Sequence, residues 1–187
     1  MRIFLKKYFQ QQGIVPLFAG PCLLLWALYL LCHYLFQTNY FSWLNSFNLL
    51  MHEAGHILFY PLGRSMGILG GSLLQIIVPA IFVVYFLKNW QWMGVGFALI
   101  WLADNLFSVA NYAADAQSRV LPLISRDPST HDWFNLLNRW GILKYDYLVA
   151  GIVRLLAVVV MLTAILVVSV PLWHFIRHKQ RTAQDRL

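Results

Sequence analysis

Residues 152–176 read IVRLLAVVVMLTAILVVSVPLWHFI, and this stretch decides what kind of fold the chain can adopt. Its only charged residue is Arg154. A helix needs about 20 predominantly apolar residues to cross the hydrocarbon core of a bilayer. The stretch is therefore predicted to be a transmembrane helix.

Four more apolar stretches upstream have the length and composition of membrane spans, at residues 15–36, 41–62, 67–87 and 92–114. The segment 116–146 before the last span is polar, and within it residues 133–140 have the pattern of an amphipathic helix that lies in the membrane interface. We therefore predict a single integral membrane domain over residues 1–187. Its fold class is an all-α bundle of about five to six transmembrane or re-entrant helices.

The composition excludes a soluble protein. Of the 187 residues, 60% are hydrophobic and only 11% are charged, whereas soluble domains have about 25% charged residues. The net charge of +7 comes mainly from basic residues near the two ends of the chain. Basic flanks beside apolar spans are typical of cytoplasmic segments of membrane proteins. We therefore expect these basic residues to lie beside a lipid bilayer, and we expect no nucleic-acid partner.

The number of spans conflicts with the charge at the ends. Five spans would place the two basic ends on opposite sides of the membrane. Either the polar segment 41–62 does not cross the membrane, or part of 116–146 re-enters it.

The chemically informative motif is HEAGH at residues 52–56, and it contains Glu53, the only glutamate of the chain. Residues four apart lie on one face of a helix, so His52 and His56 can bind one zinc ion. Glu53 is then placed to activate a water molecule as the catalytic base. Ionisable groups inside an apolar segment are costly and usually line a functional cavity, which favours a Zn²⁺ site over a chance match.

A catalytic zinc site needs a third protein ligand, and the sequence offers three candidates. Asp104 and Asp115 belong to a polar stripe, with Ser108 and Asn111, along one face of the span 92–114 and its end. His131 is followed by an acidic residue in the polar segment. We predict Asp115 or His131 as the third ligand, with Asp104 a weaker alternative.

Glycines at positions 63, 67 and 71 recur every fourth residue after the motif. In a membrane this spacing is typical of a surface along which helices pack closely. The alternative is a loosened backbone near residues 70–79 that pairs with an extended substrate.

Four short sequences carry a resemblance to a known family: 52–56 (HEAGH), 70–75 (GGSLLQ) with Pro79, 111–116 (NYAADA) and 131–133 (HDW). Together they resemble the site-2 protease class of intramembrane zinc metalloproteases, and more closely the compact bacterial members of that type. The resemblance covers residues 52–133.

The resemblance implies that His52, His56 and a later aspartate hold Zn²⁺ and that Glu53 is the base. It also implies a multi-pass protein of the bacterial inner membrane that hydrolyses a peptide bond of a membrane-embedded protein substrate. Two alternatives stay open on the sequence alone. One is a zinc hydrolase that acts on a lipid or a small amide, and the other is a non-catalytic zinc-binding membrane protein with four protein ligands.

Overall fold

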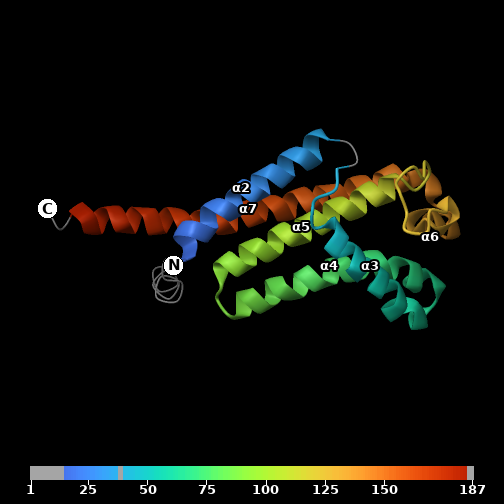
Figure 1. Ribbon diagram of the computed structural model, residues 1–187, viewed down its shortest axis with the longest axis horizontal. Coiled ribbons are helices and arrows are strands. Elements are labelled where there is room, and N and C mark those ends of the chain that lie inside the picture. Colours follow the sequence, from blue (N-terminus) through green and yellow to red (C-terminus); the bar gives the residue numbers. More distant parts are fainter. Residues whose placement is uncertain (1–14, 38–39, 185–187) are drawn as a thin grey trace.

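The regular structure of the chain is helical throughout the residues that the computed structural model describes, 15–37 and 40–184 (Figure 1). The α-helices are α2 (Val15–Phe36), α3 (Asn45–Phe59), α4 (Arg64–Lys88), α5 (Trp92–Ala114), α6 (Asp132–Arg139) and α7 (Asp146–Gln184). Single 3₁₀ turns are η1 (Tyr60–Leu62), η2 (Pro128–Thr130) and η3 (Leu143–Tyr145). The predicted all-α fold is confirmed.

Four stretches of helix in the described part of the chain are long and apolar enough to cross a membrane: Leu17–Phe36, Arg64–Lys88, Trp92–Ala114 and Leu143–Val170. The predicted span 41–62 is not one of them. Its helix α3 has 15 residues, which at 1.5 Å per residue is about 22 Å, short of the roughly 30 Å hydrocarbon core. The same segment carries the polar residues Asn45, Asn48, His52 and Glu53, so it forms a short helix beside the spans instead of a fifth span.

An even number of spans removes the conflict over the two basic ends. With four crossings, α2 begins and α7 ends on the same side of the bundle, as Figure 1 shows. Four crossings by these helices would therefore place the start of α2 and the end of the apolar stretch of α7 at one membrane face.

Helix α5 lies at the centre of the bundle. Within its apolar window 72% of the residues are buried, against 22–33% in the other three spans. Small side chains make this possible, because Ala103 and Ala110 of α5 and Ala157 and Ala164 of α7 are completely buried and let the helices approach closely. The central position of α5 matters for function because its last turns carry residues of the candidate site.

Candidate metal centre

The two histidines of the motif lie one turn apart on α3 and face α4. His52 is 6% exposed, and its ring lies directly against the backbone of α4 at Gly71. A Cβ added at Gly71 would lie 2.6 Å from Nε2 of His52. The helices are equally close at the next glycines, where a Cβ on Gly55 would lie 2.2 Å from the carbonyl oxygen of Gly70. The close-packing interpretation therefore fits Gly71, and α4 continues as a helix through residues 70–79.

Both histidines use Nδ1 for a hydrogen bond inside the protein. Nδ1 of His52 lies 2.9 Å from Oε1 of Gln75, and Nδ1 of His56 lies 2.8 Å from the carbonyl oxygen of Gly67. These oxygens accept, so each ring donates its Nδ1–H and turns Nε2 towards the site. Metal-binding histidines are fixed in this way by a second hydrogen bond.

The two Nε2 atoms point at one carboxylate oxygen, which belongs to Asp132. Oδ2 of Asp132 lies 3.0 Å from Nε2 of His52 and 3.2 Å from Nε2 of His56. Among the described residues these three form a group of donors within 4.8 Å of one another that could hold a metal ion. The site therefore combines one helix with a residue that is 80 positions away from His52.

Asp132 is held in place by α6 and by Tyr112. It is the first residue of α6, whose apolar side chains Trp133, Leu136 and Leu137 are buried. The Trp133 indole donates to Oγ of Ser72 on α4 at 3.2 Å, which docks α6 on the bundle. The Tyr112 hydroxyl accepts from the Asp132 backbone N–H at 3.0 Å and donates to its carboxylate at 3.3 Å.

Asp132 and His56 change each other's pKa. Burial alone would raise the pKa of Asp132, but hydrogen bonds from His52 and His56 outweigh it and lower that pKa to about 2. The hydrogen bond to Asp132 in turn raises the pKa of His56 to about 9, against the opposing effect of burial. A divalent cation bound at this point would displace the proton of His56, because zinc ligands bind in their deprotonated forms.

The spacing of the donors fits zinc. Zinc bonds to nitrogen and oxygen are about 2.0–2.2 Å long, and tetrahedral geometry then places neighbouring donors about 3.3 Å apart. Two edges of the donor triangle, from Nε2 of His52 and of His56 to Oδ2 of Asp132, are 3.0 and 3.2 Å long and close to that value, and all three donors lie within 4.8 Å of one another. Two imidazoles and one carboxylate are also a common donor set of catalytic zinc.

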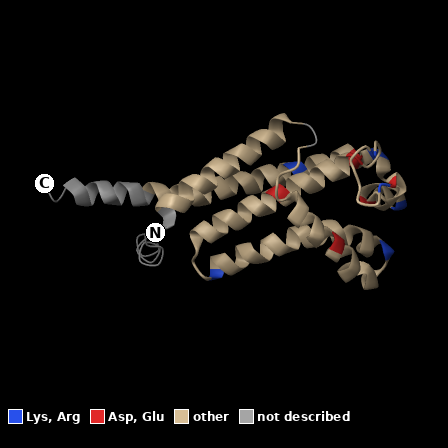
Figure 2. Cartoon of the chain, viewed as in Figure 1, with Lys and Arg blue, Asp and Glu red and all other residues tan. Residues whose placement is uncertain are grey.

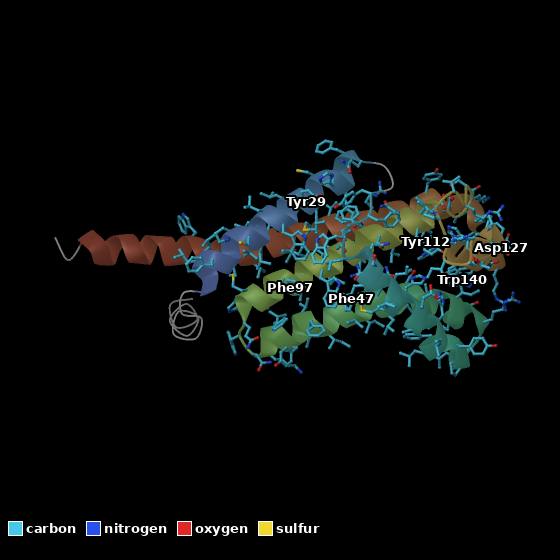
Figure 3. The ribbon with its side chains drawn as sticks, in the orientation of Figure 1. Tyr29, Phe47, Phe97, Tyr112, Asp127 and Trp140 are labelled. Atoms are coloured by element: carbon cyan, nitrogen blue, oxygen red, sulfur yellow. The ribbon has the colours of Figure 1, made fainter. Side chains whose placement is uncertain are left out.

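Glu53 and a cavity of about 520 Å³ lie on the open side of this group. The cavity is lined by the three donor residues, by Glu53 and by the Tyr112 ring. Its wall also includes Asn45 of α3 and Ser108 of α5. The segment between α5 and α6 completes the wall with Leu121, Pro122, Leu123, Ile124, Ser125 and Thr130. Tyr112 marks this end of the molecule in Figure 3. A substrate in the cavity would reach the donor triangle and Glu53 together.

The predicted third ligands Asp115 and His131 lie together, but not in the donor group. Oδ2 of Asp115 lies 3.4 Å from Nε2 of His131. The Asp115 carboxylate accepts hydrogen bonds from the Ser118 hydroxyl and from the N–H groups of Val120 and Leu121. Burial raises the pKa of Asp115, but these hydrogen bonds outweigh burial, so the pKa of Asp115 is lowered. Asp115 therefore shapes the loop that lines the cavity.

His131 has a structural task as well. Its Nδ1 accepts the N–H of Phe134, so it caps the N-terminus of α6, and burial lowers its pKa. This leaves its neutral ring against Tyr112, with ring centroids 4.3 Å apart. The structure thus moves the candidate third ligand by one residue, from His131 to Asp132.

Asp104, the weaker alternative, is 1% exposed and lies away from the histidines. Its carboxylate accepts hydrogen bonds from Tyr34, Ser42 and Asn48. It ties α2, the segment before α3, and α3 to α5, which satisfies a buried carboxylate without a metal.

Sequence reasoning missed Asp132 and Gln75 as parts of the site. The signal for Asp132 was its place beside His131 at the start of an amphipathic helix. Gln75 is a polar residue in an apolar span, four residues after Gly71. This spacing places Gln75 and Gly71 on one helix face, but it does not show that His52 packs against that face.

No family model, curated protein or solved structure matches the chain.

Proposed function

We propose that this protein is a zinc-dependent intramembrane metallopeptidase that hydrolyses a peptide bond at or within the bilayer. The observation that carries the proposal is the convergence of Nε2 of His52, Nε2 of His56 and Oδ2 of Asp132 beside an open cavity that also holds Glu53. A multi-pass protein with this site fits the bacterial inner membrane, where its substrate would be a membrane-embedded protein.

The donor set supports an open, catalytic site over a closed one. His52, His56 and Asp132 would hold Zn²⁺, and one side of the group borders the cavity. Asp115 and His131, which could have completed a four-ligand structural site, lie outside the donor group, and the Asp115 carboxylate and Nδ1 of His131 accept backbone N–H groups instead. Zinc, when bound, would supply a water of lowered pKa and a Lewis acid for the scissile carbonyl.

The remaining steps belong to residues of this chain. Glu53 is exposed on the cavity wall, where it can take a proton from the attacking water and give it to the leaving amine. Asn45 and Ser108 line the same cavity and provide polar groups for a substrate backbone. The substrate helix must unwind locally, because an intact helix satisfies its peptide groups internally and hides them behind its side chains.

The test compares Glu53→Gln with the wild-type protein. The substitution keeps the size of the side chain and removes the base. We expect zinc content to be unchanged and the hydrolysis of a transmembrane peptide in detergent or bilayers to fall about a hundredfold or more. Ser46→Ala, an exposed change on the same helix, serves as the matched control for α3.

Two outcomes would contradict the proposal. Unchanged peptide turnover in Glu53→Gln would exclude Glu53 as the catalytic base and the mechanism with it. Glu53-dependent hydrolysis of phospholipid or a small amide, with no cleavage of transmembrane peptides, would show instead a zinc hydrolase of another substrate class.

A further inference from the structure

The bundle has two ends, and the candidate site occupies only one of them. The site end contains α3, the start of α4, the end of α5, α6 and the start of α7 (Figure 1). The opposite end contains the start of α2, the turn between α4 and α5 at Asn89–Gln91, and the end of the span in α7. The orientation of the chain therefore decides which compartment the site faces.

Basic residues are distributed unevenly about the first span. Three of them precede it, at Arg2, Lys6 and Lys7, and none occurs between Phe36 and Arg64. Positive charge close to the ends of a span stays on the cytoplasmic side, and the first span usually dominates the orientation. The start of α2 is thus on the cytoplasmic side by this criterion.

The last span gives the same orientation independently. Four basic residues follow Val170, at Arg177, Lys179, Arg181 and Arg186. With Lys88 at the end of α4, the sequences that adjoin the opposite end of the bundle hold eight basic residues and one acidic residue, Asp185. Because there are four spans, both basic flanks start from one face and reinforce each other.

The site end is different in kind. It carries five basic and five acidic residues, and in Figure 2 both signs of charge lie there among the loops and short helices. These residues are Arg64, Arg119, Arg126, Arg139 and Lys144, with Glu53, Asp115, Asp127, Asp132 and Asp146. Lys and Arg are the residues that set orientation, and this end has five of them against eight at the opposite end, so it is the less basic of the two.

We infer that the candidate metal site faces the non-cytoplasmic side of the membrane and takes its substrate from that side. The inference rests on the proposed function for the identity of the substrate, but not for the orientation. Tyr112 on the cavity wall is two residues from the end of α5, a rise of about 3 Å. The substrate class is accordingly a membrane protein whose scissile bond lies close to the non-cytoplasmic edge of its span, and not at the bilayer midplane.

The test measures the exposure of single cysteines in cells. The native Cys22 and Cys32 are replaced by alanine, and one cysteine is placed at Asn138 on α6 or at Gln91 in the α4–α5 turn, both exposed positions outside the site. A membrane-impermeant maleimide is applied to intact bacterial spheroplasts that express the full chain. We expect Asn138→Cys to be labelled at once and Gln91→Cys only after lysis.

The opposite labelling pattern, or equal labelling of both cysteines in intact spheroplasts, would overturn the inference. Green fluorescent protein fused after Leu187 of the otherwise unchanged chain gives a second measurement, because this reporter becomes fluorescent in the cytoplasm and not after export in unfolded form. We expect a fluorescent fusion, and a dark one that is fully expressed would also contradict the inference. Neither measurement needs zinc or turnover, so a wrong orientation and a wrong proposed function give different results.

Discussion

At the scale of single residues, the site depends on which nitrogen of each histidine is already engaged. The spacing in HEAGH predicts that His52 and His56 share a helix face, and the structure agrees. It could not predict that Gln75 and the Gly67 carbonyl bind Nδ1 of each ring, because these partners lie on another helix. Nε2 is thereby left for the metal in both rings.

Gln75 is therefore a positioning residue for His52. Gln75→Met keeps the length of the side chain and removes the acceptor. We expect the zinc affinity to fall by roughly 10–100-fold, the usual effect of losing such an outer partner, with the melting temperature little changed. Competition with a chelator of known affinity measures this, and Gln91→Met in the α4–α5 turn is the matched control. Equal zinc affinities for Gln75→Met and the control would remove Gln75 from the site.

The raised pKa of His56 sets a pH dependence for metal binding. In the metal-free protein His56 holds a proton up to a pKa of about 9, whereas Asp132, with a pKa of about 2, is ionised throughout. Zinc must displace the His56 proton, so binding tightens as the pH rises towards 9. We expect the dissociation constant to increase about tenfold for each pH unit that is lost between pH 8 and 7. A dissociation constant that is independent of pH in this range would show that His56 is not a ligand.

At the scale of helices, the close contact between α3 and α4 brings the motif to its partners. The glycine spacing predicts close packing but not its target, which is the His52 ring at Gly71. The amphipathic segment predicted at 133–140 is confirmed as α6, Asp132–Arg139. Its function in presenting Asp132 could not be predicted, because the pattern gives the buried face of a helix and not the element on which it docks.

Gly71→Ala tests this contact. The new methyl group would lie 2.6 Å from Nε2 of His52, the atom that we assign to the metal. The ring must move, and we expect at least a tenfold loss of zinc affinity while the helical circular dichroism spectrum is retained. Gly151→Ala in α7 is the matched control, since a Cβ there meets nothing within 4 Å. Zinc binding by Gly71→Ala that equals the control would show that the ring does not occupy this place.

At the scale of the whole molecule, apolar length and composition predict an all-α fold with membrane spans. The all-α fold is confirmed, and four of the described helices are long and apolar enough to cross a membrane. Of the five predicted spans, 41–62 is not among the four found in the described residues, in agreement with the alternative that this polar segment does not cross, because the polar motif lies on a helix too short to span a bilayer. The third donor could not be found from sequence either. Asp115 follows α5, whereas His131 and Asp132 stand at the start of α6. Only the docking of α6 brings Asp132 to the histidines of α3 and leaves Asp115 and His131 bound to the backbone of the loop and of α6.

The zinc content of purified Asp132→Asn, beside that of the wild type, tests the central claim most directly. Asp127→Asn makes the same change at an exposed aspartate in the segment before α6 and serves as the control. We predict about one zinc per chain in the wild type and in Asp127→Asn, and a loss of affinity of more than about a hundredfold in Asp132→Asn. A wild-type protein that binds no zinc after reconstitution, or an Asp132→Asn protein that binds it as tightly as the wild type, would contradict the assignment of this site.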